Sequence, residues 1–244
     1  MSLLASGAFA QDGENLVPNG SFESIEGKGP RKLGSIEMAT GWESPTEAKA
    51  DLFVSNKKTP DIGTPTNLYG EETAREGENY AGIVAYSYNN KVPRSYLATK
   101  LSTKLKKGEK YCVRFNVSLA ESSTYASNDL GAMMTKKPYG SDGKGFIGED
   151  RVNVLTEGNP VLAGAYNWDK VCNTYVAEGG EKFITIGNFR KDNNATTNVK
   201  RKKAQFGTFA PILAAYYYID DVQVSLVDAD NPCECSSADP TEGY

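Results

Sequence analysis

The strongest constraint on the fold is one stretch in which large apolar side chains alternate with smaller or polar ones. In residues 111–119 the apolar side chains occupy every second position: Tyr111, Val113, Phe115, Val117 and Leu119. Successive side chains of a β-strand point to opposite faces, so a period of two places one face of the strand in a core. The stretch therefore predicts a strand with one buried face.

The same reading extends over much of the chain. Further segments of strand length are separated by clusters of Gly, Pro, Asn and Ser, and no segment carries a sustained helical period of 3.6 residues. Short strands at this spacing are typical of an all-β sandwich or barrel, and we predict an antiparallel β-sandwich of the jelly-roll type. The further predicted strands are Asn79–Tyr86, Ser95–Leu101, Leu130–Met134, Trp168–Ala177, Lys182–Phe189 and Tyr216–Val227.

A chain of 244 residues is long enough for one such domain. Residues 1–14 are predicted to be a signal-peptide remnant and leader, because an apolar stretch ends in the small-x-small pattern Ala8–Ala10 before polar residues. A short apolar strand is the alternative for this segment. Residues 15–228 are predicted to form the jelly roll. Residues 229–244, which are rich in Asp, Pro, Ser, Cys and Glu, are predicted to be a linker-like tail.

The chemistry open to this chain is limited because it contains no histidine. Ser-His-Asp and Cys-His catalysis and His-ligated zinc are thereby excluded. The 27 basic and 31 acidic residues give a net charge of −4, without the basic footprint of a nucleic-acid-binding protein. No apolar run of about 18 residues is present, so no transmembrane segment is predicted. The acidic residues fall mostly in turns, which disfavours the carboxylate pair of a glycosidase, and we expect no enzyme activity.

Four stretches together resemble one family. The front motif is Asn15–Glu23 followed by Gly41–Trp42, and the back motif is Tyr217–Val222. Between them lie Tyr111–Ala120 and Trp168–Phe189. In this order they resemble the galactose-binding-like jelly rolls, a group that includes many carbohydrate-binding modules. The chain is most similar to the N-terminal jelly-roll domain of large Bacteroidetes envelope proteins, in which an OmpA-type peptidoglycan-binding domain often follows.

This resemblance implies a non-catalytic carbohydrate-binding module of a secreted or outer-membrane-associated protein, with a polysaccharide or glycan as its partner. The implied location is outside the cytoplasm, in the periplasm, in the outer membrane or at the cell surface. A structural or protein-interaction spacer of the envelope, with an envelope protein as its partner, is the alternative. A glycoside hydrolase or lyase is a further alternative function, because fold alone does not determine function.

The resemblance also places the first and last strands side by side, with Phe22 and Val222 in the core. Many jelly rolls of this type hold a structural Ca²⁺ where the two termini meet, and the resemblance implies Glu23 and Asp221 as its ligands. Strand alternation predicts that Asp220 and Asp221 point to opposite faces, so that only one joins a given site. In the alternative, the two aspartates only cap the last strand toward solvent.

A sugar-binding face is expected to combine exposed aromatic rings with nearby polar side chains. Tyr86 and Tyr88 share one side of an extended segment, and Asn89 follows them. For each tyrosine, packing in the core is the alternative. An exposed aromatic strip on a concave face would favour sugar binding, whereas a filled face would favour protein contact or spacing. The further candidate ligand-binding residues are Arg94, Tyr96, Glu121, Tyr125 and Tyr139.

The four cysteines fall into two pairs along the chain. Cys112 and Cys172 lie in predicted strands, and in an exported protein they are predicted to form a disulfide between neighbouring strands. Two separate buried thiols are the alternative. Cys233 and Cys235 have one residue between them, too few for an unstrained mutual bridge, and they are predicted to pair with a region beyond Tyr244.

Overall fold

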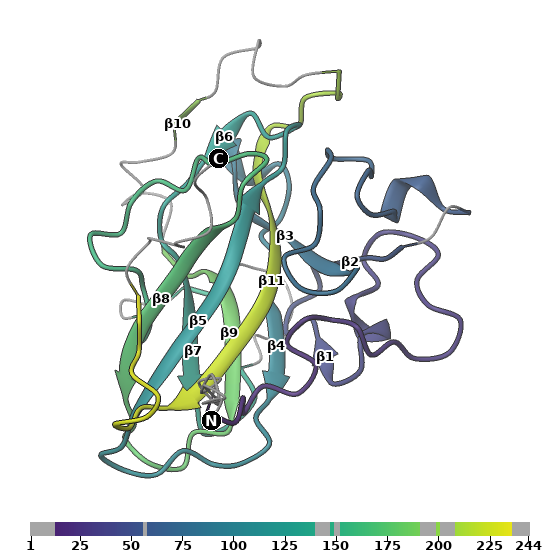
Figure 1. Ribbon diagram of the computed structural model, residues 1–244. Coiled ribbons are helices and arrows are strands. Elements are labelled where there is room, and N and C mark those ends of the chain that lie inside the picture. Colours follow the sequence, from purple (N-terminus) through teal and green to yellow (C-terminus); the bar gives the residue numbers. More distant parts are fainter. Residues whose placement is uncertain are drawn as a thin grey trace, which may run out of the picture.

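The chain folds into two antiparallel sheets packed face to face, as the computed structural model shows (Figure 1). The structure describes residues 13–55, 58–139, 147–148, 152–190, 199–200 and 208–235. The main apolar core lies between the two sheets. The predicted fold class, an all-β antiparallel sandwich of the jelly-roll type, is confirmed. In the described part of the chain, no helix has the length and apolarity needed to cross a membrane.

The larger sheet has five strands in the order β2-β3-β11-β5-β8. In Figure 1 the long strand β11 runs through its centre, between β3 and β5. Every neighbouring pair in this sheet is antiparallel. Its strands are β2 (Asp51–Phe53), β3 (Tyr80–Ser87), β5 (Lys110–Leu119), β8 (Asp169–Val176) and β11 (Ala214–Leu226).

The second sheet has four strands in the order β1-β4-β9-β7, and β6 and β10 form a separate two-stranded ribbon. In the described residues the helical content is limited to short 3₁₀ turns, η1 (Ile36–Met38), η2 (Pro60–Ile62) and η3 (Tyr88–Asn90). The remaining strands are β1 (Trp42–Glu43), β4 (Leu97–Lys100), β6 (Tyr125–Ala126), β7 (Leu130–Thr135), β9 (Phe183–Asn188) and β10 (Val199–Lys200).

Alternation along the strands builds the core, as the sequence predicted. The odd-numbered residues of β5 from Tyr111 to Leu119 all belong to the apolar cluster between the sheets. Every predicted strand coincides with an observed one to within a few residues at each end. Phe22 and Val222 are completely buried, and Phe22 packs against the Trp42 ring at a centroid distance of 4.8 Å. The core positions implied by the resemblance are confirmed.

The N-terminal segment closes the larger sheet by lying along the second half of β11. The Leu16 amide donates to the Val224 carbonyl at 2.7 Å, and the Val222 amide donates to the Gly20 carbonyl at 3.0 Å. The side-chain oxygen of Asn15 accepts from the Val224 amide at 3.0 Å. A Cβ on Gly20 would lie 2.1 Å from the Val222 oxygen, so this close approach requires glycine. The two ends of the domain therefore lie side by side, as predicted.

A β-bulge interrupts β11 within the back motif. Asp220 pairs with Asn116 and Gln223 with Arg114, so β11 holds one more residue than β5 across this interval. Asp221 takes up the bulge with φ of 51°, and its carboxylate accepts from the side chains of Asn116 at 3.1 Å and Gln223 at 2.5 Å. The prediction that Asp220 and Asp221 point to opposite faces is wrong, because the bulge breaks the alternation on which it rested.

The C-terminal segment does not leave the domain directly after β11. The Val227 amide donates to the Lys110 carbonyl at 2.9 Å, and the chain then turns back to the larger sheet, where Cys233 and Cys235 are each bridged to a strand. The predicted linker over residues 229–244 is therefore wrong for 229–235. The remainder of that tail and the predicted signal remnant lie outside the described residues, apart from the last two leader positions.

Candidate functional site

Three tyrosines gather at the end of the sandwich where β3 ends. Tyr86 lies near the end of β3, Tyr88 in η3 and Tyr125 in β6. The rings of Tyr86 and Tyr125 meet edge to face at a centroid distance of 5.3 Å. The rings of Tyr88 and Tyr125 are parallel within 6° at 6.5 Å. We call these three side chains the tyrosine platform.

The turn that carries Tyr88 is fixed by local hydrogen bonds. The Ser87 hydroxyl accepts from the Val92 amide at 3.0 Å and donates to the carbonyl of the same residue, which closes the turn. The Tyr88 amide donates to the Leu213 carbonyl at 3.2 Å. Asn89 takes a left-handed conformation with φ of 53°, which Asn tolerates better than most residues. These hydrogen bonds fix the turn from which the Tyr88 side chain projects.

The residues of the platform differ in exposure. Tyr88 is 47% exposed and Asn89 is exposed, whereas Tyr86 and Tyr125 are half-buried and pack against the main core. A flat aromatic face offers an apolar surface to the C–H face of a sugar ring, and a neighbouring amide offers hydrogen bonds to its hydroxyls. The structure therefore brings four of the predicted ligand-binding residues close together, and their binding role stays a prediction.

Arg94 and Tyr96 are not part of this surface. The Arg94 side chain is 4% exposed, and its guanidinium donates to the carbonyls of Asn188, at 3.2 Å, and Arg190. Tyr96 is completely buried, and its hydroxyl donates to the Asn188 carbonyl at 3.1 Å and accepts from the Ile147 amide at 2.9 Å. Their prediction as exposed ligand-binding residues is wrong, because both side chains anchor the end of β9 and its following turn.

Glu121 is also an interior residue. Its side chain is 1% exposed, and its two carboxylate oxygens accept from the Glu71 amide at 2.9 and 3.0 Å. The Glu121 carboxylate also lies against Gly70, where an added Cβ would collide with it. It fixes the loop before β3 and is not available to a ligand, so this prediction is corrected too. Tyr139 is half-buried against Phe189, at a ring distance of 6.5 Å, and does not belong to the platform.

The outer face of the larger sheet carries aromatic rings, but they are covered. Asn67 donates to the Tyr80 hydroxyl at 3.0 Å and accepts from the Tyr218 hydroxyl at 2.8 Å. Trp168 packs edge-on against Tyr80 at 6.0 Å and donates its indole N–H to the Thr73 carbonyl at 2.9 Å. This part of the face is therefore filled. The fully buried aromatic side chains there are Phe53, Tyr80, Tyr216 and Tyr218.

A buried carboxyl lies beneath the same cluster. Asp51 accepts hydrogen bonds from the Tyr216 hydroxyl and the Gly34 amide. Burial raises the pKa of Asp51 to about 6, although these hydrogen bonds partly oppose the shift. Burial also raises the pKa of Tyr216, and the neighbouring Asp51 charge adds to that shift. Asp51 therefore acts within the packing of this face and not as an exposed catalytic group.

The motif carboxylates hold a loop by its backbone. Glu23 accepts from the amides of Glu78 and Asn79 at 2.9 and 2.8 Å. Asp220 is completely buried and accepts from the amides of Arg75 and Glu76 at 2.7 and 3.0 Å. The two acids thus anchor consecutive parts of the segment before β3. Burial raises the pKa of Asp220 to about 8 against the opposing effect of these amide donors.

These contacts do not fit a shared calcium site. The oxygens of Glu23 and Asp221 face N–H donors, whereas Ca²⁺ is bound by a shell of oxygen ligands. In the described part of the chain, the acids form no group of three that could share an ion, and the only group of that kind is made of cysteines. Calcium binding by Glu23 and Asp221 stays a prediction without support from this geometry.

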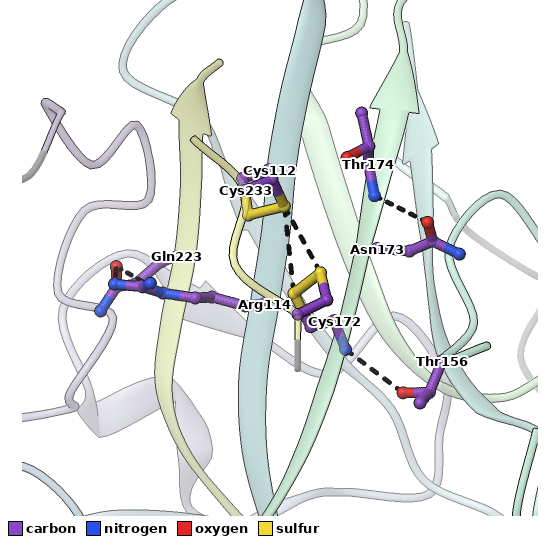
Figure 2. The surroundings of a disulfide bond; sticks show 9 residues. Cys112, Arg114, Thr156, Cys172, Asn173, Thr174, Gln223 and Cys233 are labelled. Carbon is purple, nitrogen blue, oxygen red and sulfur yellow. Dashed lines mark hydrogen bonds between the residues drawn. A yellow bond between two sulfur atoms is a disulfide. The ribbon is translucent and has the colours of Figure 1, made fainter. Parts of the chain in front are cut away.

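The predicted bridge between Cys112 and Cys172 is wrong. Cys112 is bonded to Cys233 and Cys172 to Cys235 (Figure 2). On the paired strands Cys112 lies opposite Thr174 and Cys172 opposite Arg114, so the two cysteines are diagonal neighbours. Such residues have Cα atoms about 7–8 Å apart, beyond the usual reach of a disulfide. The C-terminal segment supplies one sulfur to each strand instead.

A polar pocket of about 260 Å³, which the sequence did not indicate, lies between residues 72–75 and 166–168. Tyr166 lines it, is 62% exposed and has φ of 73°, which is rare for a bulky residue. Glu72, whose pKa is raised by burial, is the one acid among the lining residues. A typical glycosidase requires two carboxyl groups flanking the bond, and the described lining of this pocket supplies one. The loop around Tyr166 has no periodic pattern that would have marked it.

No protein-family model and no curated protein matches this chain. Among solved structures, it is similar to the CBM22-1 xylan-binding domain from Paenibacillus barcinonensis, with 13% identity and a TM-score of 0.41 over 89% of this chain and 97% of that one. The K1 cleaved adhesin domain of Lys-gingipain from Porphyromonas gingivalis has 11% sequence identity and a TM-score of 0.42, over 85% of this chain and 96% of that one. A putative sugar-binding protein from Bacteroides thetaiotaomicron has 11% sequence identity and a TM-score of 0.42, over 88% of this chain and 100% of that one. Superpositions this loose transfer neither a ligand nor an activity to this chain.

Proposed function

We propose that this chain is a non-catalytic glycan-binding domain that contacts its polysaccharide through the tyrosine platform. The observation that carries the proposal is the exposed ring of Tyr88 lying parallel to that of Tyr125 at the end of the sandwich. The exposed Asn89 beside it supplies polar groups for sugar hydroxyls. The absence of histidine and the single acid in the polar pocket support a binding role without hydrolysis.

The disulfides support an exported protein. The described cysteines are all in disulfides, and disulfides persist mainly in oxidising compartments such as the periplasm or the cell exterior. The proposed location is the periplasm, the outer membrane or the cell surface. The proposal retains the resemblance to OmpA-type envelope proteins, in which such a domain would present a glycan-binding surface next to a cell-wall anchor.

The test is a glycan-array screen of the purified domain, followed by titration of any glycan that binds. The Tyr88→Ala variant is expected to weaken binding at least about tenfold, because loss of one stacking ring removes about 1.4 kcal/mol or more. The Tyr88 side chain is largely outside the core, so the variant should keep the melting temperature of the wild type.

Tyr166→Ala is the matched control, because Tyr166 is another exposed tyrosine and lines the polar pocket, not the platform. Unchanged binding by this variant and weakened binding by Tyr88→Ala would locate the ligand on the platform. The opposite pattern would place the sugar in the polar pocket and contradict the proposed surface. A wild-type domain that binds no glycan on the array would contradict the proposed function.

A structural or protein-interaction spacer of the envelope is the second candidate. Two observations favour it: the aromatic part of the outer sheet face is filled, and the exposed apolar side chains of Val92 and Leu213 lie on the segments bonded to the platform turn. Exposed apolar clusters of this kind are typical of protein contacts. A blank glycan array would favour this reading.

A further inference from the structure

The two disulfides form one cluster of four sulfur atoms. Sulfurs of different bridges approach each other to 4.0 Å between Cys172 and Cys233 and to 3.5 Å between Cys233 and Cys235. All four sulfur atoms lie within 4.8 Å of one another. Figure 2 shows the two bridges stacked side by side over β5 and β8, with the sulfur contacts running between them.

The sheet and the C-terminal segment together impose this arrangement. Cys112 on β5 and Cys172 on β8 alternate with core residues, so both point to the outer face. Cys233 and Cys235 arrive from one short segment in which Glu234 alone separates them. Two sulfurs are thus held on paired strands and two on one short segment, so that all four meet at one place.

We propose that, when both disulfides are reduced, the four thiolates form a binding site for one soft divalent cation such as Zn²⁺. In a tetrahedral site with metal–sulfur bonds of about 2.3 Å, neighbouring sulfurs lie about 3.8 Å apart. The two contacts between the bridges, at 4.0 and 3.5 Å, lie on either side of this value. On reduction the two bonded pairs have to separate to about this distance, whereas all four sulfurs already lie within 4.8 Å of one another.

The cluster is open to a reductant from one side. Cys112 and Cys172 are buried, whereas Cys233 and Cys235 are half-exposed, so a reductant can approach from the side of the C-terminal segment. Arg114 lines the same small pocket of about 150 Å³ as Cys112. Asp230 and Glu234 line this pocket as well, and the Arg114 guanidinium is directed at the Gln223 side chain, to which its Nε donates at 3.0 Å. Basic and acidic side chains therefore both lie near the cluster.

The chemistry balances as follows. A small dithiol such as dithiothreitol gives two electrons and two protons to each protein disulfide and itself becomes a cyclic disulfide. Two dithiols therefore yield four protein thiols. Binding of one divalent cation then releases four protons to solvent as the thiols become thiolate ligands. Oxidation by a disulfide of higher potential reverses the process, expels the cation and restores the two bridges.

The test titrates Co²⁺, a spectroscopic substitute for Zn²⁺, into the whole chain after reduction and anaerobic removal of the reductant. We expect one equivalent to bind, with the intense visible absorption of tetrahedral thiolate-bound cobalt, and Zn²⁺ to displace it. The oxidised protein should give no such absorption. Cys235→Ser leaves three sulfurs and is expected to lower the affinity at least tenfold.

Two controls keep the outcome decisive. Far-ultraviolet circular dichroism of the reduced, metal-loaded chain should keep the β-spectrum of the oxidised protein. Ser225→Ala alters another residue of the same pocket and should leave the affinity unchanged. No thiolate absorption in the reduced wild type, equal affinity in Cys235→Ser, or binding only by an unfolded chain would each overturn the proposal.

Discussion

Removal of the bridge between Cys112 and Cys233 tests how the C-terminal segment stabilises the sandwich. The double variant Cys112→Ala/Cys233→Ala leaves Cys172 and Cys235 to form the remaining disulfide. It changes two small side chains, one of them buried on the outer face of the sheet. The main effect is therefore expected in the unfolded chain, which gains conformational freedom when the cross-link is lost.

The magnitude follows from the length of chain that the bridge closes. Taken alone, the bridge spans 121 residues, and the chain-entropy relation assigns it about 4.9 kcal/mol. With the other disulfide intact, the shortest loop runs from Cys112 to Cys172, across that bridge, and from Cys235 back to Cys233. This loop holds about 62 residues, which corresponds to about 4.3 kcal/mol. We therefore expect the variant to lose about 4 kcal/mol of unfolding free energy.

Urea unfolding followed by circular dichroism measures this loss, and intact-mass analysis checks that the second bridge has formed. The double variant Cys112→Ala/Cys172→Ala is the comparison, because it removes both connections between the strands and the C-terminal segment and should lose more. If the first variant loses less than about 1 kcal/mol, or if the two variants are equally stable, the proposed pairing or its entropic role is refuted.

Two further predictions concern the carboxyl groups of Asp51, which is buried, and of Glu23, which belongs to the front motif. The pKa of Asp51, about 6, lies above its unfolded value, so the folded state keeps the proton and unfolding free energy falls as pH rises from about 4 to about 6, by up to ~3 kcal/mol. Asp51→Asn should reduce this fall in urea unfolding at the two pH values and leave the part contributed by Asp220, whose pKa is also raised, and an unchanged pH slope would contradict the assignment. Glu23→Ala leaves the Glu78 and Asn79 amides without their acceptor and should cost about 1–2 kcal/mol. The loss should be equal in calcium and in chelator, and a calcium-dependent melting temperature abolished by Asp221→Ala would instead establish the metal site.

The strands were predictable because their signal is local. Each strand of the two main sheets that carries alternating apolar residues could be located from the sequence, since one buried face requires a period of two. The front and back motifs also placed Phe22 and Val222 correctly, because both belong to the core in which the chain ends meet. The very short strands β1, β2, β6 and β10 have no such pattern and were not predicted.

The errors arose where the outcome depends on register or on contacts between distant loops. Whether Cys112 can reach Cys172 depends on which residues of β5 and β8 lie opposite each other, and the sequence does not encode this register locally. The bulge at Asp221 is one additional residue, invisible in the alternating pattern. Glu121 and Arg94 look like polar surface residues, but each bonds a backbone segment that reaches it only in the folded chain.

The central position of β11 has a consequence for how the chain folds. β11 (Ala214–Leu226) is the last strand in the sequence, yet it separates β3 from β5 and also receives the N-terminal segment. Until β11 is present, β3 and β5 have no common partner and the larger sheet is divided into two halves. Contacts between such distant segments slow folding, because the loops must close before the pairing is gained. The larger sheet therefore cannot be completed until its last strand is available, whereas the second sheet, β1-β4-β9-β7, does not include β11.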